Sequence, residues 1–304
     1  MNAPLLDERL RALLRALSVD RTAGAAELAA RAADGFARAC GRADLGELRL
    51  AARALAAVQP SMAPLLNLAN GLLLALERGG RDPVSSAARA ARAFALGLSR
   101  DRKAIAARAA RLVPAHGPVA VHSWSSTVTA ALVRAGRRRS LEVVCSESRP
   151  GLEGRRTAAT LARAGLRVRL LPDLAFLDAA AEADLFLVGA DALSAFGLVN
   201  KAGTCAAARR IREGGGTVLA LADSSKVLPS VLAARLRDRP GPAREVWPRP
   251  ARGVRIESPT FDTTPLALLS SVVTPLGARP PVGVVAEAER RPVAGTLLHA
   301  GARP

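Results

Sequence analysis

Apolar residues recur at helical spacing through the first third of the chain. Leucines return every three or four positions between residues 5 and 17, and alanines do the same between residues 25 and 32. Each set forms one apolar stripe on a helix. The pattern predicts about five helices and no strand over residues 4–112. Turn-forming residues separate these predicted helices at 18–22, 41–44, 59–64 and 79–83.

A different pattern begins at Gly117 and Pro118. Short apolar runs then alternate with amphipathic helical segments. This alternation is typical of βαβ units, which form a mostly parallel sheet with helices on both faces. The runs lie at residues 119–122, 141–146, 166–171, 184–189 and 217–222.

The sequence thus predicts an α/β protein with two domains. An all-helical N-terminal domain occupies residues 1–113, and a Rossmann-like domain with a mostly parallel sheet occupies residues 117–304. Residues 239–252, rich in Pro and Arg, are expected to form an irregular loop before a final unit at 254–274. We expect the Pro- and Gly-rich tail after Pro280 to pack against a neighbouring subunit.

Composition argues against several classes of protein. Half of the 304 residues are hydrophobic, so the chain can fold around a large core, made mainly of Ala, Leu and Val because aromatic residues are only 3%. The three cysteines form no C-x-x-C pair, which predicts neither a disulfide framework nor a metal site. Charges interrupt residues 1–16, and the apolar run at 64–76 is too short to cross a bilayer. We expect a cytoplasmic protein without membrane contact or cofactor.

The formal charge of +18 raises the question of nucleic-acid binding. Only three of the 44 basic residues are lysines, and the arginines are spread with alanine through the helices. No zinc-finger spacing, aromatic RNA-binding motif or heptad-linked basic region accompanies the charge. We expect nonspecific adhesion to polyanions at low salt, and no specific recognition of nucleic acid.

Polar motifs follow predicted strands at the point where each strand ends. The carboxyl ends of parallel strands form the edge at which open α/β sheets bind ligands. The motifs supply guanidiniums, a carboxylate, an amide, an ammonium and glycines, which suit a small anionic ligand with hydroxyl groups, such as a sugar phosphate. They read E-S-R-P-G-L-E-G-R at 147–155, V-G-A-D-A at 188–192 and N-K-A-G-T at 200–204.

Asp191 is the catalytic candidate, because it closely follows a predicted strand and should emerge at the sheet edge. The alternative is a helix N-cap or a loop carboxylate paired with an arginine. Asn200 and Lys201 are candidate ligand contacts, since lysine is scarce here and a compact ammonium binds differently from a guanidinium. A solvated turn is their alternative. Lys226 follows another strand and has a similar but weaker case.

Arginines and a helix start supply candidate phosphate contacts. Arg149 and Arg155 could each clamp a phosphate with two hydrogen bonds, although surface arginines are common in this chain. We expect Glu147 to orient Arg149 or its loop rather than to touch a ligand. Arg21 and Gly24 precede or open a predicted helix whose first backbone amides could hold a phosphate.

Two residues of the V-H-S-W-S-S segment allow more than one interpretation. His122 ends a strand, where a histidine either titrates usefully near neutral pH or hydrogen-bonds the neighbouring loop. We favour the hydrogen-bonding role. Trp124 either covers a ligand or fills the domain interface.

These motifs resemble the family that joins methylthioribose-1-phosphate isomerase, ribose-1,5-bisphosphate isomerase and the alpha, beta and delta regulatory subunits of eukaryotic translation initiation factor 2B. The resemblance covers nearly the whole chain. It implies that Asp191 is the acid/base acting on the sugar, that Asn200 and Lys201 contact substrate hydroxyls and phosphate, and that the amides near Gly24 hold phosphate. Further segments agree in order: D-R-T-A-G-A-A-E at 20–27, Q-P-S-M-A-P-L-L-N-L at 59–68, V-H-S-W-S-S at 121–126 and F-D-T-T-P at 261–265.

Two positions depart from the isomerases. Those enzymes carry a cysteine where this chain has Ser123, and a hydroxyl is a much weaker acid that needs an adjacent base. They also tend to carry an arginine where Gln59 stands, and its loss weakens phosphate binding by about 1–3 kcal/mol. V-H-S-W-S-S is closer to the regulatory subunits, in which a small residue and an aromatic residue follow the histidine.

Two functions therefore stay open, and the isomerase is slightly favoured. An aldose–ketose isomerase for a ribose phosphate with phosphate at C1 would use Asp191, with Ser123 or a ligand-bound water in place of the thiol. A catalytically silent sensor of sugar phosphates or nucleotides would keep the pocket without the reaction. In both cases the resemblance implies a symmetric homo-oligomer, at least a dimer.

Overall fold

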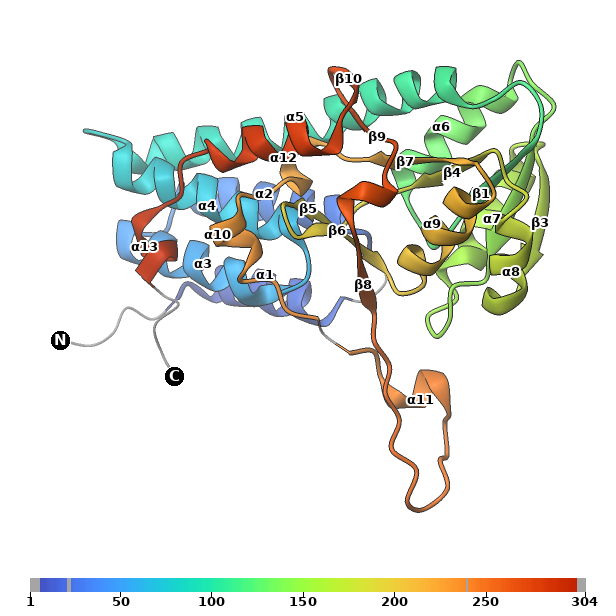
Figure 1. Ribbon diagram of the computed structural model, residues 1–304. Helices are drawn as coiled ribbons and strands as arrows, with labels where there is room; N and C mark the ends of the chain where they lie inside the picture. The colour runs from blue at the N-terminus through green and yellow to red at the C-terminus, as the bar shows by residue number, and fades with distance from the viewer. Residues whose placement is uncertain (1–5, 21–22, 239, 300–304) are drawn as a thin grey trace.

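The computed structural model describes residues 6–20, 23–238 and 240–299, and begins with a bundle of helices (Figure 1). The helices follow the apolar spacing, and the breaks between them fall in the predicted turn clusters. This part of the fold prediction is confirmed. The helices are α1 (Glu8–Val19), α2 (Ala25–Ala39), α3 (Leu45–Val58), α4 (Ala63–Arg78) and α5 (Pro83–Leu112).

Capping residues decide where several of these helices begin. Asp44 accepts a hydrogen bond from the Glu47 amide while the Glu47 side chain accepts one from the Asp44 amide, which is a capping box at the start of α3. Asp82 caps α5 by accepting from the Ser85 amide. Helix α2 differs, because its N-cap Gly24 has no side chain to satisfy the first amides. Among the described residues, no side chain caps these amides, and we expect them to be available to a ligand.

The second half of the chain forms a seven-stranded sheet that is parallel except at one edge. The order is β10-β9-β7-β4-β1-β2-β3, and only β10 runs antiparallel to its neighbour. All five predicted strands are present, which confirms the mostly parallel sheet. The strands are β1 (Pro118–Val121), β2 (Glu142–Ser146), β3 (Arg167–Leu171), β4 (Leu185–Val188), β7 (Thr217–Leu221), β9 (Ser271–Thr274) and β10 (Gly277–Arg279).

Helices cover both faces of this sheet, because successive side chains of a strand point to opposite faces. Ala120 and Phe186 pack with α8, α9 and α12 on one face, whereas Val119 and Leu185 pack with α6, α7 and the last turns of α5 on the other. The same long helix therefore belongs to the bundle and to the sheet core. The covering helices are α6 (Ser126–Gly136), α7 (Glu153–Arg163), α8 (Asp173–Ala180), α9 (Thr204–Glu213) and α12 (Pro281–Glu289).

A small antiparallel sheet, which the sequence did not predict, lies between the bundle and the large sheet (Figure 1). Its first two strands form a hairpin whose turn leads into Gly197, where φ is +128°. It carries the N-K-A-G-T motif at the end of its second strand. The strands are β5 (Ala192–Ser194), β6 (Gly197–Lys201) and β8 (Phe261–Thr264).

The described part of the C-terminal tail packs on its own chain, and the expected contact with a neighbouring subunit stays a prediction. The Asn70 side chain of α4 donates to the Pro292 carbonyl and accepts from the Ala294 amide. Ala294 and Leu297 are buried among the helices of the bundle. Hydrogen bonds and apolar contacts with the N-terminal helical bundle therefore determine where the tail lies. It ends in α13 (Gly295–His299).

An arm projects from the body between β7 and β8 (Figure 1). It corresponds to the Pro- and Arg-rich segment, which lacks regular structure apart from α11 (Ala243–Val246) among its described residues.

The division into two domains at residues 113 and 117 stays a prediction. The remaining short elements are η1 (Ser224–Lys226), α10 (Ser230–Ala233) and η2 (Leu266–Leu268).

Gly154 is required for α7 to approach β2. A Cβ atom at Gly154 would collide with the Ser146 carbonyl oxygen, which is backbone and cannot rotate away. We expect Gly154→Ala to lower the free energy of unfolding by about 1–3 kcal/mol, the usual cost of overpacking. Urea unfolding would measure it, with Gly283→Ala as the control. Gly283 lies in α12 with nothing near its Cβ position, so alanine there should stabilise by about 0.5–1 kcal/mol. Equal effects at both positions would contradict this account.

Candidate functional site

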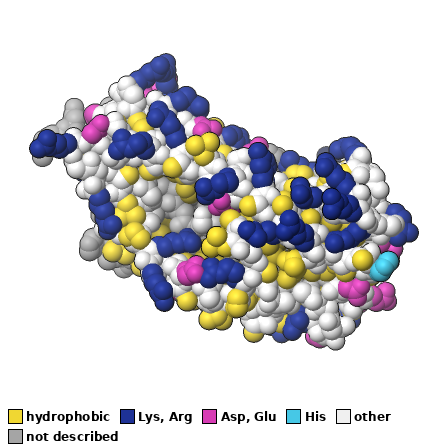
Figure 2. All heavy atoms as spheres, turned by 90° about the horizontal axis from the view of Figure 1, so that it is seen from above, with side chains coloured by type: hydrophobic (Ala, Val, Ile, Leu, Met, Phe, Trp, Pro, Cys, Tyr) yellow, Lys and Arg dark blue, Asp and Glu magenta, His cyan; other side chains and the backbone are white. Residues whose placement is uncertain are grey.

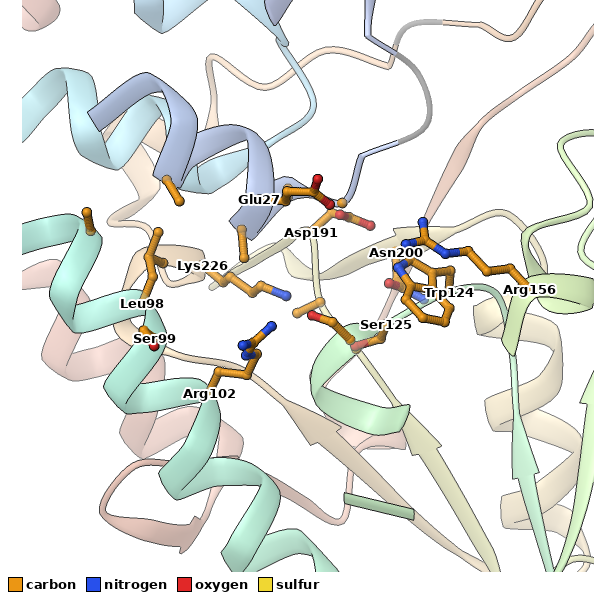
Figure 3. Close-up of a pocket in the computed structure, with 18 residues that line it drawn as sticks. Glu27, Leu98, Ser99, Arg102, Trp124, Ser125, Arg156, Asp191, Asn200 and Lys226 are labelled. Carbon is orange, nitrogen blue, oxygen red and sulfur yellow. The ribbon is translucent and has the colours of Figure 1, made fainter. Parts of the chain in front are cut away.

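A cavity of about 440 Å³ lies where the helical bundle meets the carboxyl edge of the large sheet (Figure 3). A smaller cavity of about 130 Å³ adjoins it, since the two share part of their lining. The elements that meet here come from distant parts of the sequence: the start of α2, the loop after β1, the loop after β4, the end of β6 and η1. The shared residues are Gly24, Ala25, Trp124, Asp191 and Asn200.

Asp191 lines both cavities from the loop between β4 and β5. Its amide donates to the Val199 carbonyl and its carbonyl accepts from the Ala63 amide, so its backbone is fixed from two sides. Among the described residues, none donates a hydrogen bond to its carboxylate. Burial raises the pKa of the Asp191 carboxyl above its ordinary value, against the opposing charges of Lys226 and Lys201. Asp191 is therefore a half-buried carboxyl group with an altered proton affinity.

The two candidate lysines differ in their partners. The Lys201 Nζ atom lies 2.8 Å from Glu153 Oε1, so its charge is already neutralised. Lys226 is only 8% exposed and points into the larger cavity. Within the described part of the chain, its ammonium has no hydrogen-bond or ion-pair partner. Because an unpaired buried charge is costly, Lys226 is the better placed of the two to receive an anionic group.

The Asn200 side chain lies next to Asp191 at the boundary of the two cavities (Figure 3). Its Nδ2 donates to Thr204 Oγ1, which in turn donates to the Lys201 carbonyl. These bonds fix the orientation of the amide. The amide oxygen is thus held at the site, where a sugar hydroxyl is a suitable donor.

The start of α2 forms the opposite wall. Gly24, Ala25 and Ala26 line the larger cavity with uncapped backbone amides. Gln59, the second departure from the isomerase pattern, lines the smaller cavity and donates from Nε2 to the Leu17 and Asp20 carbonyls. Gln59 therefore holds the end of α1 in place. Arg21 lies outside the described residues.

Ser123 lines the smaller cavity in a left-handed backbone conformation, with φ of +64°. Its amide donates to Ser148 Oγ, and its carbonyl accepts from Thr157 Oγ1. Among the residues described, no base contacts its hydroxyl group. The hydroxyl therefore lacks the partner that would activate it.

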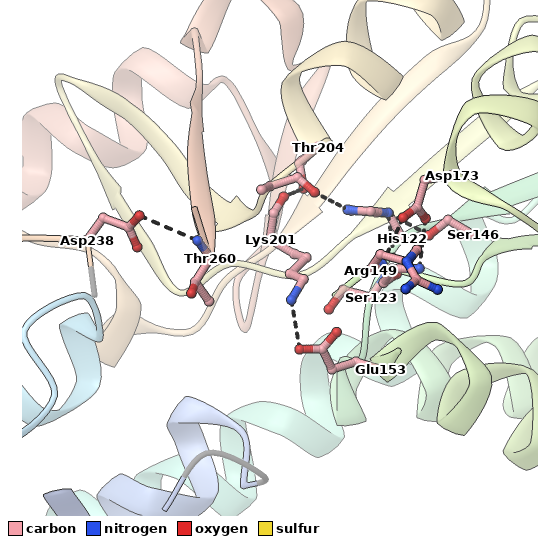
Figure 4. A network of polar contacts seen from close by, with 12 residues as sticks. His122, Ser123, Ser146, Arg149, Glu153, Asp173, Lys201, Thr204, Asp238 and Thr260 are labelled. Carbon is pink, nitrogen blue, oxygen red and sulfur yellow. Dashed lines mark hydrogen bonds and ion pairs between the residues drawn. The ribbon is translucent and has the colours of Figure 1, made fainter. Parts of the chain in front are cut away.

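His122 is buried in a hydrogen-bonded network behind Ser123 (Figure 4). Its Nε2 lies 2.9 Å from the Ala202 carbonyl, so this nitrogen carries the proton and Nδ1 accepts from Ser146 Oγ at 2.6 Å. Burial lowers the pKa of His122, which keeps the imidazole neutral. The favoured interpretation, a histidine that hydrogen-bonds the neighbouring loop, is confirmed.

Arg149 and Arg155 do not line either cavity. Both pair with Glu147, at 3.9 Å and 3.1 Å, and their side chains are 54% and 56% exposed. The expectation that Glu147 orients its loop agrees with these contacts, whereas the expected phosphate clamp by the two arginines does not. The arginine of this segment that reaches the larger cavity is Arg156, whose guanidinium stacks 3.9 Å from the centre of the Trp124 ring.

Sequence reasoning missed four residues that shape the site. Arg156 follows a named candidate by one position, and nothing in E-G-R-R-T distinguishes the two arginines. Arg102 reaches the cavity from the middle of α5, and no motif surrounds it. Glu153 neutralises Lys201 from another element. Asp262, within the F-D-T-T-P segment, accepts from the Gly203 and Cys205 amides and so caps α9.

Two absences apply to the part of the chain that the structure describes. Over residues 6–20, 23–238 and 240–299, there is no group of three or more His, Cys, Asp or Glu side chains that could hold a metal ion. Within the same ranges, no helix has the length and apolar character needed to span a membrane. Among the described residues, the site therefore consists of cations, backbone amides and carboxyl groups, of which Asp191 lines both cavities.

Known proteins resemble this chain in both sequence and fold. The profile of the family described as the initiation factor 2 subunit family matches residues 8–281. The ribose 1,5-bisphosphate isomerase of Archaeoglobus fulgidus is 30% identical over 244 residues, which is 77% of each chain. The crystal structure of translation initiation factor eIF-2B from Pyrococcus horikoshii OT3 superposes with a TM-score of 0.80 at 26% identity, over 92% of this chain and 100% of that chain.

A third protein agrees at the level of the fold alone. The 5-methylthioribose 1-phosphate isomerase of Pyrococcus horikoshii OT3 superposes with a TM-score of 0.69 at 22% identity, over 91% of this chain and 86% of that chain. The profile covers nearly all of the helices and strands described above, and the resemblance drawn from the motifs is confirmed. The chain belongs to the initiation factor 2 subunit family.

Proposed function

We propose that this protein is a sugar-phosphate isomerase that converts an aldose to a ketose, acting on a ribose phosphate with phosphate at C1. Asp191 carries the proposal. It is a carboxyl group at the cavity wall with a pKa raised by burial and opposed by two ammonium groups. Such a group can both accept and return a proton more readily than an ordinary aspartate. Isomerisation requires these two transfers, from one carbon or oxygen of the sugar to its neighbour.

The other residues would bind and orient the sugar. The uncapped amides at Gly24 and the start of α2 suit a phosphate, because helix N-termini favour anions. Lys226 would supply a positive charge, and the oriented Asn200 amide would accept from a hydroxyl group. Lys201 would act together with Glu153. Arg21 stays a proposed phosphate contact on the strength of the resemblance.

Arg149 and Arg155 are left out of this proposed site, because their exposure and pairing with Glu147 direct them away from the cavities. In the proposed site, Arg156 stacked on Trp124 replaces these two arginines. A cation stacked on an indole is held in position by the ring. The pair would close the open side of the cavity over the sugar.

A second function rests on Ser123. Because no base reaches its hydroxyl within the described residues, the partner of Asp191 in the isomerases has no equivalent here. This favours a catalytically silent sensor that binds a sugar phosphate or a nucleotide in the same cavity. In either function we expect a cytoplasmic homo-oligomer, at least a dimer, which light scattering at micromolar concentration would check.

A ligand and turnover assay distinguishes the two functions. Ribose 1,5-bisphosphate and methylthioribose 1-phosphate would be titrated by calorimetry, and the ketose product would be followed by chromatography, for the natural chain and for Ser123→Cys. The isomerase predicts detectable turnover that rises by about 10-fold or more in the cysteine variant, since a thiolate is the better acid/base partner. Saturable binding with no turnover in both proteins would establish the sensor. Absence of binding would reject the site.

A further inference from the structure

A second hollow, beside the cavity described above, lies between α5 and α6. It measures about 570 Å³, and four cationic side chains line it: Arg102 and Lys103 from α5, Arg134 from α6, and Arg137 at the C-cap of α6. No carboxylate is among its lining residues. We call it the α5–α6 groove. Figure 2 looks down on the side of the molecule where α5 lies, and shows Lys and Arg side chains gathered there. The rest of the lining is small: Ala106, Ala107, Ser126, Ala130 and Val133.

The four cations of the groove are not neutralised by the protein. In the described part of the chain, none of them forms an ion pair or donates a side-chain hydrogen bond. Many other basic residues do, including Arg155 with Glu147 and Arg279 with Glu287. Like charges held by two packed helices repel one another, and an anion placed between them lowers that repulsion. The groove is therefore a site of unbalanced positive charge rather than an ordinary ion-paired surface.

We propose that the α5–α6 groove binds an oligophosphate group, either inorganic or the phosphate chain of a nucleotide. Its four cations match the roughly three to four negative charges of a triphosphate at neutral pH. The α6 wall, from Ser126 to Arg137, spans about 16 Å at the helical rise, which fits a short phosphate chain. No aromatic residue lines the groove, so it offers no surface on which a base could stack. Phosphates alone are recognised.

The groove and the sugar-phosphate cavity share a wall. Arg102 and Ser126 line both spaces. Figure 3 shows the Arg102 side chain extending from α5 toward Lys226 and Ser125. An oligophosphate in the groove attracts the Arg102 guanidinium and adds negative charge beside the cavity. The groove is thus an inhibitory site, in which bound oligophosphate weakens the binding of a sugar phosphate. This coupling, unlike the groove itself, rests on the proposed function.

Calorimetry of the full chain with tripolyphosphate, without divalent cations and at about 0.15 M salt, tests the groove. Three proteins are compared: the natural chain, Arg134→Gln with Arg137→Gln, and a control with Arg49→Gln and Arg53→Gln. The control removes the same charge from two exposed arginines of α3, far from the groove in sequence and outside its lining. We expect one saturable site, weakened about 10-fold in the groove variant, as for lost charge-assisted hydrogen bonds, and unchanged within about 2-fold in the control.

Several outcomes would overturn the proposal. Equal weakening in the control variant would identify nonspecific attraction to a basic protein. Binding of tripolyphosphate that does not saturate would also indicate nonspecific attraction. ATP and GTP should bind as tightly as tripolyphosphate, so a strong preference for one base would place the ligand elsewhere. Coupling is tested by titrating a ribose phosphate with and without saturating tripolyphosphate. If the ribose phosphate fails to bind at all, the proposed function falls while the groove result stands.

Discussion

Asp191→Asn should lower turnover of the preferred ribose phosphate by about 10²-fold or more, the lower range for loss of general acid–base catalysis. The amide keeps the shape of the carboxyl group but cannot accept a proton. Affinity should change only modestly, because the proposed phosphate contacts are the α2 amides and Lys226 rather than Asp191. Product formation and calorimetry on the same preparations measure the two effects. Retained turnover would exclude Asp191 as the acid/base.

The same substitution should stabilise the folded protein at neutral pH. Burial raises the pKa of Asp191 in the folded state above the value of 3.8 for the free group. The folded state therefore prefers the protonated carboxyl, and ionisation destabilises it as the pH rises through the folded-state pKa. Below the unfolded pKa both states are protonated and the difference vanishes. Urea unfolding should thus show a gain for Asp191→Asn at pH 7 that disappears near pH 3.

An exposed aspartate provides the control for both measurements. The Asp178 side chain on α8 is 89% exposed, with Arg210 at 4.0 Å as its ion-pair partner. Asp178→Asn should leave turnover unchanged and alter stability by less than about 0.5 kcal/mol. If Asp178→Asn and Asp191→Asn stabilise equally at pH 7, the gain reflects the loss of any carboxylate and not the environment of Asp191.

Local patterns predicted most of the fold. The breaks between the five helices depend on Gly, Pro and Asp at helix ends, and these act within one turn of the chain. Each of the five apolar runs after residue 117 became a strand of the large sheet, since a fully buried strand is apolar on both faces. The hairpin at 192–201 was missed because its strands are short and continue the polar motif. The packing of the tail on the bundle was not predicted because its partner, Asn70, lies more than 200 residues away.

The chemistry of the site was predicted less well, because a sequence does not show which side chains pair with one another. A sequence shows that Lys201 and Lys226 both follow strands, but not that Glu153 neutralises the first and leaves the second without a partner. It likewise does not show whether Arg155 or Arg156 faces the cavity, since one residue turns a helix by 100°. Family motifs indicated Asp191 and Asn200 correctly as neighbours in space, because motif positions at strand ends converge on one edge.

Lys226→Met should weaken sugar-phosphate binding by about 10- to 100-fold, the range for loss of a hydrogen bond to a charged group. Lys226 is buried, and its ammonium has no partner among the described residues, so a ligand phosphate is the group that would compensate its charge. Lys201→Met should have a smaller effect on affinity, because Glu153 already pairs with that ammonium. Calorimetry with one ribose phosphate compares the two, with Arg49→Met, on the exposed face of α3, as the control.

The Lys226 variant should fold normally, since the turn that carries it does not depend on its side chain. Asn67 Nδ2 of α4 donates to the Ser225 and Val227 carbonyls on either side of it. Loss of the ammonium removes the positive charge that lowers the pKa of Asp191 most, so that pKa rises further. If Asp191 acts as a base in its ionised form, the acidic limb of kcat/KM moves to higher pH. A variant with normal affinity and an unshifted pH profile would show that Lys226 has no part in binding or catalysis.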